Sequence, residues 1–383
     1  MNIARADTSL LARWWWTVDH WTLAALSCLI GFGAVLAMAA TPAVATRIGL
    51  DPFFFVRRQI GLFIPAIAIM VAISMMSPRA VRMLALAGFV ISVSLLAATF
   101  VVGVEIKGAR RWIHLPGLSI QPSEFVKPTF AVVAAWLFAT QRKHERFPGD
   151  LIAIGLFFLV VSLLLLQPDV GMTIVITSVW FSQFFLAGLR MLWVLLLGGS
   201  GVASLVAAYF VFPHVASRVD RFLDPQAGDT YQINTALEAF LNGGLFGVGP
   251  GEGTVKSVLP DAHTDFIFAV AGEEFGLLAC LIVVALFGFI VLRGFARALQ
   301  ESNLFILLAV AGLMTQFGLQ ALINMGSTLN LIPTKGMTLP FISYGGSSML
   351  AMGLTLGLAL ALTRRRPGAY TVGEGLAKAG AFT

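Results

Sequence analysis

Long apolar stretches, separated by short polar breaks, fill most of the chain. An α-helix needs about 20 apolar residues to cross the hydrocarbon core of a bilayer. Ten stretches are free of Asp, Glu, Lys and Arg, namely 20–46, 59–78, 83–104, 128–141, 151–168, 170–189, 191–217, 275–292, 302–334 and 336–363. The stretch at 128–141 is short, and it reaches spanning length as 122–141 if Glu124 and Lys127 lie inside the helix. The pattern predicts an all-α polytopic membrane protein with about ten transmembrane helices.

The breaks between these stretches differ greatly in length. The longest runs from His214 to Asp265, and its 52 residues far exceed a usual connection of about 4–6 residues. It holds an amphipathic piece at 233–241 and two glycine clusters, and its aromatic and apolar content predicts an ordered loop. We therefore expect an extracytoplasmic loop at 214–264 between helices 7 and 8. A shorter polar loop is expected at Asn324–Pro333.

Composition narrows the class of protein. The chain is 58% hydrophobic and 11% charged, against about 25% charged residues in an average soluble domain. This excludes an ordinary soluble enzyme, a disordered chain and a disulfide-stapled secreted domain. The two cysteines, Cys28 and Cys280, lie in apolar runs and are interpreted as packing residues. We expect a membrane domain at 19–366, between cytoplasmic tails at 1–18 and 367–383.

The placement of charges follows from this topology. With the N-terminus inside, 14 Lys and Arg residues fall on the inner side and 10 on the outer side, which is a modest positive-inside bias. Ten of the 19 acids fall on the outer side or its boundary, seven of them within 214–265. The outer cations thus need an explanation other than topology, and binding of an anionic headgroup is one.

Asp265 is the acid best placed for chemistry. It precedes the apolar run 266–270, and so should lie at the outer membrane edge, where a carboxylate can serve as a general base. The alternative is a helix cap, in which Thr264 or Asp265 satisfies free N–H groups at the helix start. Two turns further, Glu273 and Glu274 are acids at membrane depth. Structural pairing with a base or with the backbone is favoured over catalysis for them.

The third candidate region is cationic. Lys107, Arg110 and Arg111 lie beside a tryptophan on the predicted outer side, and arginine can hold phosphate oxygens bidentately. Glu124 and Lys127 follow at i, i+3 spacing, which makes them neighbours on one helix face. A local ion pair therefore explains Lys127 as well as a substrate contact does.

Two further segments have structural interpretations. Gln167–Gly171 fills a tight turn, and turn chemistry alone would explain its Pro, Asp169 and Gly. Pro333–Ser348 is rich in small and helix-breaking residues, which permit close packing or an unwound segment. The histidines and cysteines have no metal-ligand spacing, and no phosphate loop or dinucleotide motif is present.

These motifs occur in one order along the chain, and that order resembles the SEDS family (shape, elongation, division and sporulation). The segments that carry the resemblance are Lys107–Trp112, Gln121–Glu124, Gln167–Asp169, His263–Phe268, Glu273–Gly276 and Ile342–Ser348. It covers roughly residues 20–366. Gln167 and the Pro333–Gly336 segment favour the division branch over the elongation branch, whereas Asp261 stands where the family often has Glu.

The resemblance implies a peptidoglycan glycosyltransferase that polymerises lipid II at the outer face of the inner membrane and releases undecaprenyl pyrophosphate. The essential loop aspartate of the family maps onto Asp265, expected to act as general base on the acceptor hydroxyl. The cations expected to stabilise the leaving pyrophosphate are Arg110, Arg111 and Lys127. The full set expected to bind substrate is Lys107, Arg110, Arg111, Glu124, Lys127, Gln167, Asp169, His263, Ser343 and Tyr344.

The resemblance also implies partners: a class B penicillin-binding protein, which is a transpeptidase, and other membrane proteins of the division septum. No cofactor is evident, although a divalent cation shared with lipid phosphates would need few protein ligands. Two other functions remain open from the sequence. A lipid II flippase would move the substrate without making a bond, and a division scaffold would leave the chemistry elsewhere.

Overall fold

The computed structural model describes residues 9–106, 109–115, 118–188, 190–224 and 230–364. Its helices are α1 (Leu10–Thr17), α2 (His20–Arg47), α3 (Phe54–Ser74), α4 (Pro78–Val102), α5 (Pro122–Lys143), α6 (Gly149–Leu166), α7 (Val170–Leu186), α8 (Met191–Val211), α9 (Pro213–Leu223), α10 (Tyr231–Gly243), α11 (Ile267–Leu299), α12 (Leu304–Thr328) and α13 (Gly346–Thr363). One 3₁₀ turn (Val255–Ser257) and three short strands, β1 (Val104–Ile106), β2 (Ala109–Leu115) and β3 (Leu118–Ile120), complete the described elements.

The predicted all-α membrane fold is confirmed. Among the described residues, eight helices are long and apolar enough to cross a bilayer: α2, α3, α4, α6, α8, α11, α12 and α13. α7 is a shorter apolar helix, and α5 has spanning length but contains Glu124 and Lys127. The protein is therefore a multi-pass membrane protein, and the count of ten spans stays a prediction.

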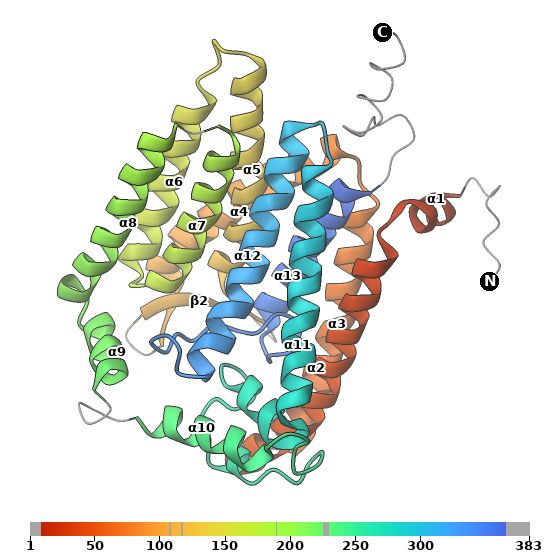
Figure 1. The fold of residues 1–383 in the computed structure, drawn as a ribbon, viewed down its shortest axis with the longest axis vertical. Helices are drawn as coiled ribbons and strands as arrows, with labels where there is room; N and C mark the ends of the chain where they lie inside the picture. The colour runs from red at the N-terminus through yellow and green to blue at the C-terminus, as the bar shows by residue number, and fades with distance from the viewer. Residues whose placement is uncertain (1–8, 107–108, 116–117, 189, 225–229, 365–383) are drawn as a thin grey trace.

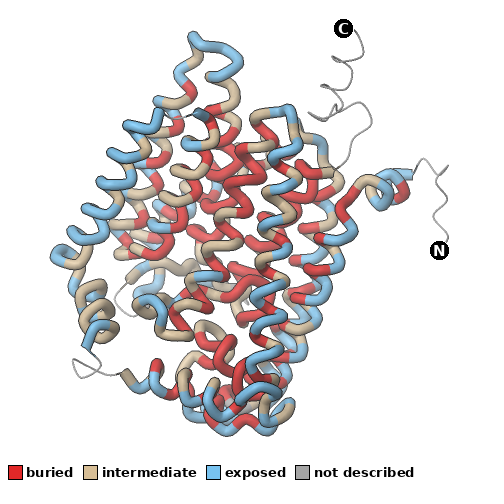
Figure 2. The backbone as a smooth tube through the Cα atoms, in the orientation of Figure 1, coloured by how far each residue is buried: buried red, intermediate tan, exposed pale blue. Residues whose placement is uncertain are grey.

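The centre of the bundle is formed by α5, α12 and α13. α5 packs against α4 and α12, while α13 packs against α3. Figure 2 shows buried backbone through this centre and exposed backbone along α8, none of whose residues is buried. The core is thus built from α5, α12 and α13. Peripheral helices such as α8 are exposed on the outside of the bundle.

The long loop lies across one end of the bundle, where Figure 1 shows α9, α10 and the strand β2. The amphipathic piece predicted at 233–241 is part of α10, as expected. We call this end, which also carries Asp265, the loop end, and the opposite end the tail end.

A break in α11 anchors the loop. Gly276 has φ 76° and ψ −178°, which interrupts the helix. The freed N–H groups of Leu277 and Leu278 donate to the carbonyls of Gly244 and Leu245, at 2.9 and 3.2 Å. Backbone polar groups left unsatisfied at membrane depth would cost several kcal/mol each, so the loop completes the helix it packs against.

One predicted boundary was wrong, and an alternative left open by the sequence is now decided. Asn324 was expected in a loop, but α12 continues to Thr328 because the Asn324 side chain binds buried backbone carbonyls. For Pro333–Ser348 the sequence left close packing or an unwound segment open, and the structure shows the unwound segment, because α13 begins only at Gly346. Residues 329–345 form an irregular segment. This segment lies against residues 261–266, which we call the Asp265 loop.

Candidate functional site

Asp265 lies at the loop end, two residues before α11. Its backbone carbonyl accepts hydrogen bonds from Asn324 Nδ2 at 2.9 Å and from Thr328 Oγ1 at 3.4 Å, both on α12. Its carboxylate lies against Gly336, where an added Cβ would be 2.8 Å from Oδ2. The side chain is half-buried, so it is shielded and still reachable.

The predicted N-cap residue of α11 was wrong. The N-cap of α11 is Phe266, and it makes no side-chain capping hydrogen bond. The Thr264 hydroxyl instead donates to the Asp261 carbonyl within the turn, at 3.2 Å. Neither Thr264 nor Asp265 is therefore the N-cap residue of α11.

The segment before α13 holds the Asp265 loop from the other side. Ser343 Oγ donates to the carbonyl of Thr264 at 2.6 Å and accepts from the N–H of Leu339 at 2.7 Å. The N–H of Tyr344 donates to the carbonyl of His263 at 2.9 Å. The Ser343 hydroxyl thus holds the backbone of the Asp265 loop in place. This role differs from the predicted contact with substrate.

The rings of His263 and Tyr344 form a cluster with Phe55 of α3. The three ring centroids are 5.1 to 5.5 Å apart. Burial lowers the pKa of His263, so its imidazole is neutral at pH 7. Burial also raises the pKa of Tyr344, which keeps its hydroxyl protonated. This cluster is an uncharged wall on one side of the Asp265 loop.

A charged cluster forms around the Gln167–Asp169 turn. Arg111 on β2 donates to the carbonyls of Gln167 and Pro168, at 2.9 and 2.6 Å, and lies 3.7 Å from the Asp169 carboxylate. Lys335 Nζ is 2.8 Å from the same carboxylate. The structure thus brings together a strand, a turn and the irregular segment that also contacts Asp265.

Turn chemistry alone does not account for Asp169. The carboxylate does cap α7 by accepting from the N–H of Met172, at 3.3 Å. Burial alone would raise the pKa of Asp169, but Lys335 and Arg111 outweigh burial and hold it below its usual value. The Gln167 amide donates to the carbonyl of Leu96, so Gln167 faces α4 inside the fold.

Arg218 on α9 completes this cluster. It donates to the carbonyl of Thr334 at 3.1 Å. Burial and the nearby guanidinium groups of Arg111 and Arg221 lower the pKa of Arg218, while Asp169 and Asp265 oppose that change. Asp265 is therefore close enough to act on a cation of this cluster. We call Arg111, Asp169, Arg218 and Lys335 the outer cluster.

Two members of the outer cluster, Arg218 and Lys335, were not predicted as site residues. Both were counted among the cations of the outer side, but Arg218 was read only as part of the long loop and Lys335 only as part of a segment rich in small residues. The signal that could have identified Lys335 is its position one residue before Gly336 in an otherwise uncharged stretch.

Comparison with known proteins identifies the family. A family model described as "Cell cycle protein", for FtsW, RodA and SpoVE, matches residues 20–367. The chain belongs to the SEDS family. A curated relative from Caulobacter vibrioides, named "Probable peptidoglycan glycosyltransferase FtsW", is 49% identical over 96% of this chain and 94% of its own length. A relative of the same name from Coxiella burnetii is 38% identical over 90% of this chain and 96% of its own length.

Solved SEDS structures share the fold. A chain from "Structural coordination of polymerization and crosslinking by a peptidoglycan synthase complex" has a TM-score of 0.75 at 30% identity, covering 90% of this chain and 97% of its own. The rod shape determining protein RodA of Thermus thermophilus has a TM-score of 0.67 at 27% identity, covering 92% of this chain and 99% of its own.

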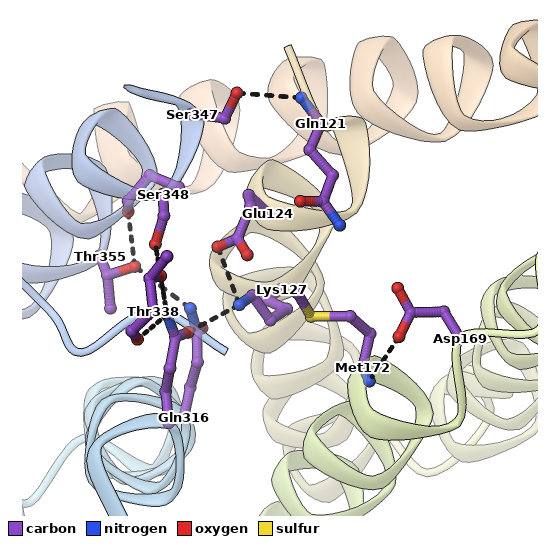
Figure 3. A network of polar contacts seen from close by, with 12 residues as sticks. Gln121, Glu124, Lys127, Asp169, Met172, Gln316, Thr338, Ser347, Ser348 and Thr355 are labelled. Carbon is purple, nitrogen blue, oxygen red and sulfur yellow. Dashed lines mark hydrogen bonds and ion pairs between the residues drawn. The ribbon is translucent and has the colours of Figure 1, made fainter. Parts of the chain in front are cut away.

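The predicted pair Glu124 and Lys127 lies inside the SEDS bundle, away from the surface. Lys127 Nζ is 2.9 Å from the Glu124 carboxylate and donates to Gln320 Oε1 at 2.7 Å, and its side chain has no exposed area. Figure 3 shows Lys127 between Glu124 and α12. The local ion pair is confirmed, and Lys127 has no accessible surface with which to meet a pyrophosphate.

Of the other predicted cations, Arg110 is exposed and lies 3.5 Å from Glu105 of the neighbouring strand. An ion pair of this kind contributes about 0–1 kcal/mol in water. Lys107 lies outside the described residues. Of the two described cations of this motif, Arg111 is the one that the fold brings to the outer cluster.

The acids Glu273 and Glu274 have structural roles in this SEDS chain. Glu273 accepts from the N–H groups of Thr254 and Val255 at 2.8 and 2.9 Å, and Glu274 pairs with the Lys256 ammonium. Structural pairing was the favoured prediction, and it is confirmed. Both carboxylates fasten the long loop to α11.

No group of three or more His, Cys, Asp or Glu side chains is placed to hold a metal ion in the part of the chain that the structure describes. The two cysteines are free, with Cys28 exposed and Cys280 buried.

Proposed function

We propose that this chain is a peptidoglycan glycosyltransferase that polymerises lipid II into glycan strands at the division septum. The observation that carries the proposal is the position of Asp265, a half-buried carboxylate beside the cationic outer cluster. The names of the relatives support the same activity. In this proposal Asp265 lies on the periplasmic side of the inner membrane, with both termini in the cytoplasm and residues 19–366 forming the membrane domain.

The reaction needs a base and a site for a polyanion. Asp265 removes the proton from the acceptor sugar hydroxyl, whose oxygen attacks the anomeric carbon of the donor strand. The bond from that carbon to the pyrophosphate breaks, and its electron pair leaves with undecaprenyl pyrophosphate. Negative charge then grows on the pyrophosphate oxygens, where preorganised cations lower the barrier. Arg111, Lys335 and Arg218 supply those cations.

The rest of the predicted site fits around this reaction. Asp169 holds Arg111 and Lys335 in place, as the two ion pairs indicate. His263 and Tyr344 offer neutral rings on the other side of the Asp265 loop, next to Phe55. In our proposal these rings meet the uncharged sugar, and the outer cluster meets the phosphates.

A class B penicillin-binding protein is the proposed partner, because strands made here need a transpeptidase to crosslink them. The related chain in a peptidoglycan synthase complex that coordinates polymerization and crosslinking supports this pairing. The division branch is supported by relatives named FtsW.

The test is polymerisation of lipid II by purified protein together with its partner transpeptidase. Asp265→Asn keeps the size of the side chain and removes the base, so the rate should fall by about 10²–10⁴-fold. Asp261→Asn is the matched control, because it neutralises another acid of the same turn and should leave the rate unchanged. Wild-type rates for Asp265→Asn would overturn the role of Asp265.

A flippase and a scaffold give different results in the same experiment. Neither would yield glycan polymer from the wild-type protein. A flippase would instead move lipid II across vesicles without polymer formation, and that outcome would overturn the proposed enzyme.

A further inference from the structure

A row of buried polar side chains follows one face of α12 toward Asp265. Gln316, Gln320, Asn324 and Thr328 are spaced four residues apart, which places them on the same helix face. Each is at most 1% exposed. Polar groups inside a membrane helix are costly, and they persist where they have partners and a purpose.

Asn324 joins two segments of the site. Its Nδ2 donates to the carbonyl of Asp265 at 2.9 Å and to the carbonyl of Met337 at 2.6 Å. An amide nitrogen has two N–H donors, and each is used here on a different segment. One side chain therefore sets the distance between the Asp265 turn and residues 335–337.

The two segments fit together with little clearance. A Cβ at Gly336 would lie 2.8 Å from Asp265 Oδ2, so the carboxylate rests directly on the backbone at residue 336. Lys335, the preceding residue, holds its ammonium on Asp169. A shift of the Met337 carbonyl relative to the Asp265 carbonyl would thus change the separation of Asp265 and Lys335.

Gln320, one turn earlier on α12, holds the next residue of the same segment. It donates to the carbonyl of Thr338 at 3.1 Å and accepts from Lys127 at 2.7 Å. Figure 3 shows Lys127 and Thr338 beside this part of α12. Lys127 therefore reaches the site indirectly, as support for the segment that carries Lys335.

We propose that Asn324 is a positioning residue, which holds the Asp265 carboxylate and the Lys335–Gly336 backbone at the separation that sugar transfer requires. This inference rests on the proposed glycosyltransferase activity and adds to it a residue that touches no substrate. A displacement of about 1 Å can lower a reaction rate by about 10²-fold, so a group that fixes this distance has a measurable effect.

The bundle contains a matched control. Gln183 on α7 also donates its amide nitrogen to two backbone carbonyls, those of Ala131 and Leu308, at 2.7 and 3.0 Å. Like Asn324, Gln183 is fully buried, and the amide oxygens of both lack a hydrogen-bond partner among the described residues. Gln183 ties α5 to α12 within the bundle and contacts neither Asp265 nor residues 335–337.

The experiment compares Asn324→Leu with Gln183→Met in the full chain, purified with its partner transpeptidase. Both changes remove a buried amide that bridges two carbonyls, so both should lower the thermal stability by similar amounts. The initial rate of lipid II polymerisation is measured over a range of lipid II concentrations. For Asn324→Leu we expect kcat about 10²-fold lower with KM unchanged, and for Gln183→Met we expect wild-type values of both.

A double-mutant cycle tests whether Asn324 acts through Asp265. Asp265→Glu displaces the carboxylate, and its effect on kcat should be much smaller in the Asn324→Leu background than in the wild-type background. A purely structural role predicts effects that multiply. If Asn324→Leu does not fold, Asn324→Ala replaces it in both measurements.

The outcomes separate this inference from the proposed function. Wild-type kcat per folded Asn324→Leu protein, or equal losses in the Asn324 and Gln183 variants, overturns the positioning role while the enzyme stands. Absence of polymer from wild-type protein overturns the enzyme and, with it, this inference.

Discussion

The two ends of the bundle each hold a buried aspartate with two cations, and the two clusters are built differently. At the tail end, Asp19 is 2.6 and 2.9 Å from two nitrogens of Arg293 and 2.9 Å from Arg297. At the loop end, Asp169 is 2.8 Å from Lys335 and 3.7 Å from Arg111. Both aspartates are 2% exposed in their side chains, so burial does not distinguish them.

Each aspartate caps a helix N-terminus, Asp19 on α2 and Asp169 on α7, but the helix ends next to the cations differ in sign. At the tail end, Arg297 lies in the last turn of α11 and also donates to the carbonyl of Thr363, the last residue of α13. Cations are stabilised at such C-termini, and Asp19 is stabilised as the N-cap of α2. At the loop end the cations Arg111 and Lys335 surround the N-terminus of α7, which itself carries positive partial charge.

The comparison shows which of the two clusters has its charges balanced by the fold itself. Every charge of the tail-end cluster meets an opposite charge or a helix end of the suitable sign, which is typical of a structural lock. The outer cluster adds Arg218 to an already positive surrounding, and the pKa of Arg218 is lowered by burial and by neighbouring cations. Positive charge in excess of what the fold needs indicates a site for an anion.

The strongest way to break this comparison is to remove the excess charge. We expect Arg218→Met to lower the rate of lipid II polymerisation by about 10²–10³-fold, the range for loss of one preorganised group at a developing charge. The stability should not fall, because the change relieves repulsion from Arg111 and Arg221. Polymerisation assays and thermal unfolding on the same preparation measure both effects.

The control for this variant is Arg57→Met, which removes an exposed arginine paired with Asp51 on the same predicted side of the membrane. It lowers the net charge equally and should leave the rate unchanged. A large loss of stability in Arg218→Met, with a normal rate per folded molecule, would mean that the outer cluster only stabilises the fold, as the cluster at Asp19 does.

The converse change is at the tail end, and its effect should be on stability alone. Asp19→Asn leaves two arginines without their carboxylate, and hydrogen bonds to charged groups contribute about 1.5–3 kcal/mol each. Because the arginines are partly exposed, we expect a loss of about 2 kcal/mol in the free energy of unfolding, with normal polymerisation per folded molecule.

The pH dependence of this loss has a definite sign. Burial alone would raise the pKa of Asp19, but hydrogen bonds from Arg293 and Thr22 and the charge of Arg297 hold it below its usual value. A carboxylate with a lowered pKa stabilises the fold above its unfolded pKa and loses that effect as the pH falls through its folded pKa. The stability difference between wild type and Asp19→Asn should therefore be constant from pH 5 to 8 and shrink below about pH 4. A difference that instead grows below pH 5 would contradict the assigned ion pairs.

Periodicity in the sequence predicted most of the architecture, because each span is a local property of the chain. Most of the helices, including the amphipathic α10, could be read from hydrophobic patterns. The end of α12 could not, because Asn324 is polar and its helical state depends on carbonyls contributed by Asp265 and Met337. Local patterns cannot supply partners that arrive from other segments.

The same limit explains what was missed at the site. Asp265 was identified by its place before an apolar run, and Arg111 by its neighbours in the chain. Lys335 and Asp169 are 166 residues apart, and Arg218 and Thr334 are 116 apart, so no local signal links them. Lys127 shows the opposite mistake, because a residue predicted to contact substrate has only a structural role. Its ion pair with Glu124 accounts for its charge, and its side chain is too buried to reach a substrate.

The smallest predicted effect concerns His214, which can report the charge of the outer cluster without disturbing it. Burial lowers the pKa of His214, and Arg218, Arg111 and Lys335 lower it further, while Asp169 opposes them. Removing a cation or adding an anion should therefore raise this pKa, because each change favours the imidazolium.

We expect Arg218→Met to raise the pKa of His214 toward 6.5, and inorganic pyrophosphate to raise it in the wild-type protein, as followed by histidine NMR. In the Arg218→Met protein the response to pyrophosphate should be weaker, because one of the cations that binds the anion is gone. A pKa of His214 that ignores pyrophosphate in the wild-type protein would mean that the outer cluster, like the cluster at Asp19, has no place for an anion.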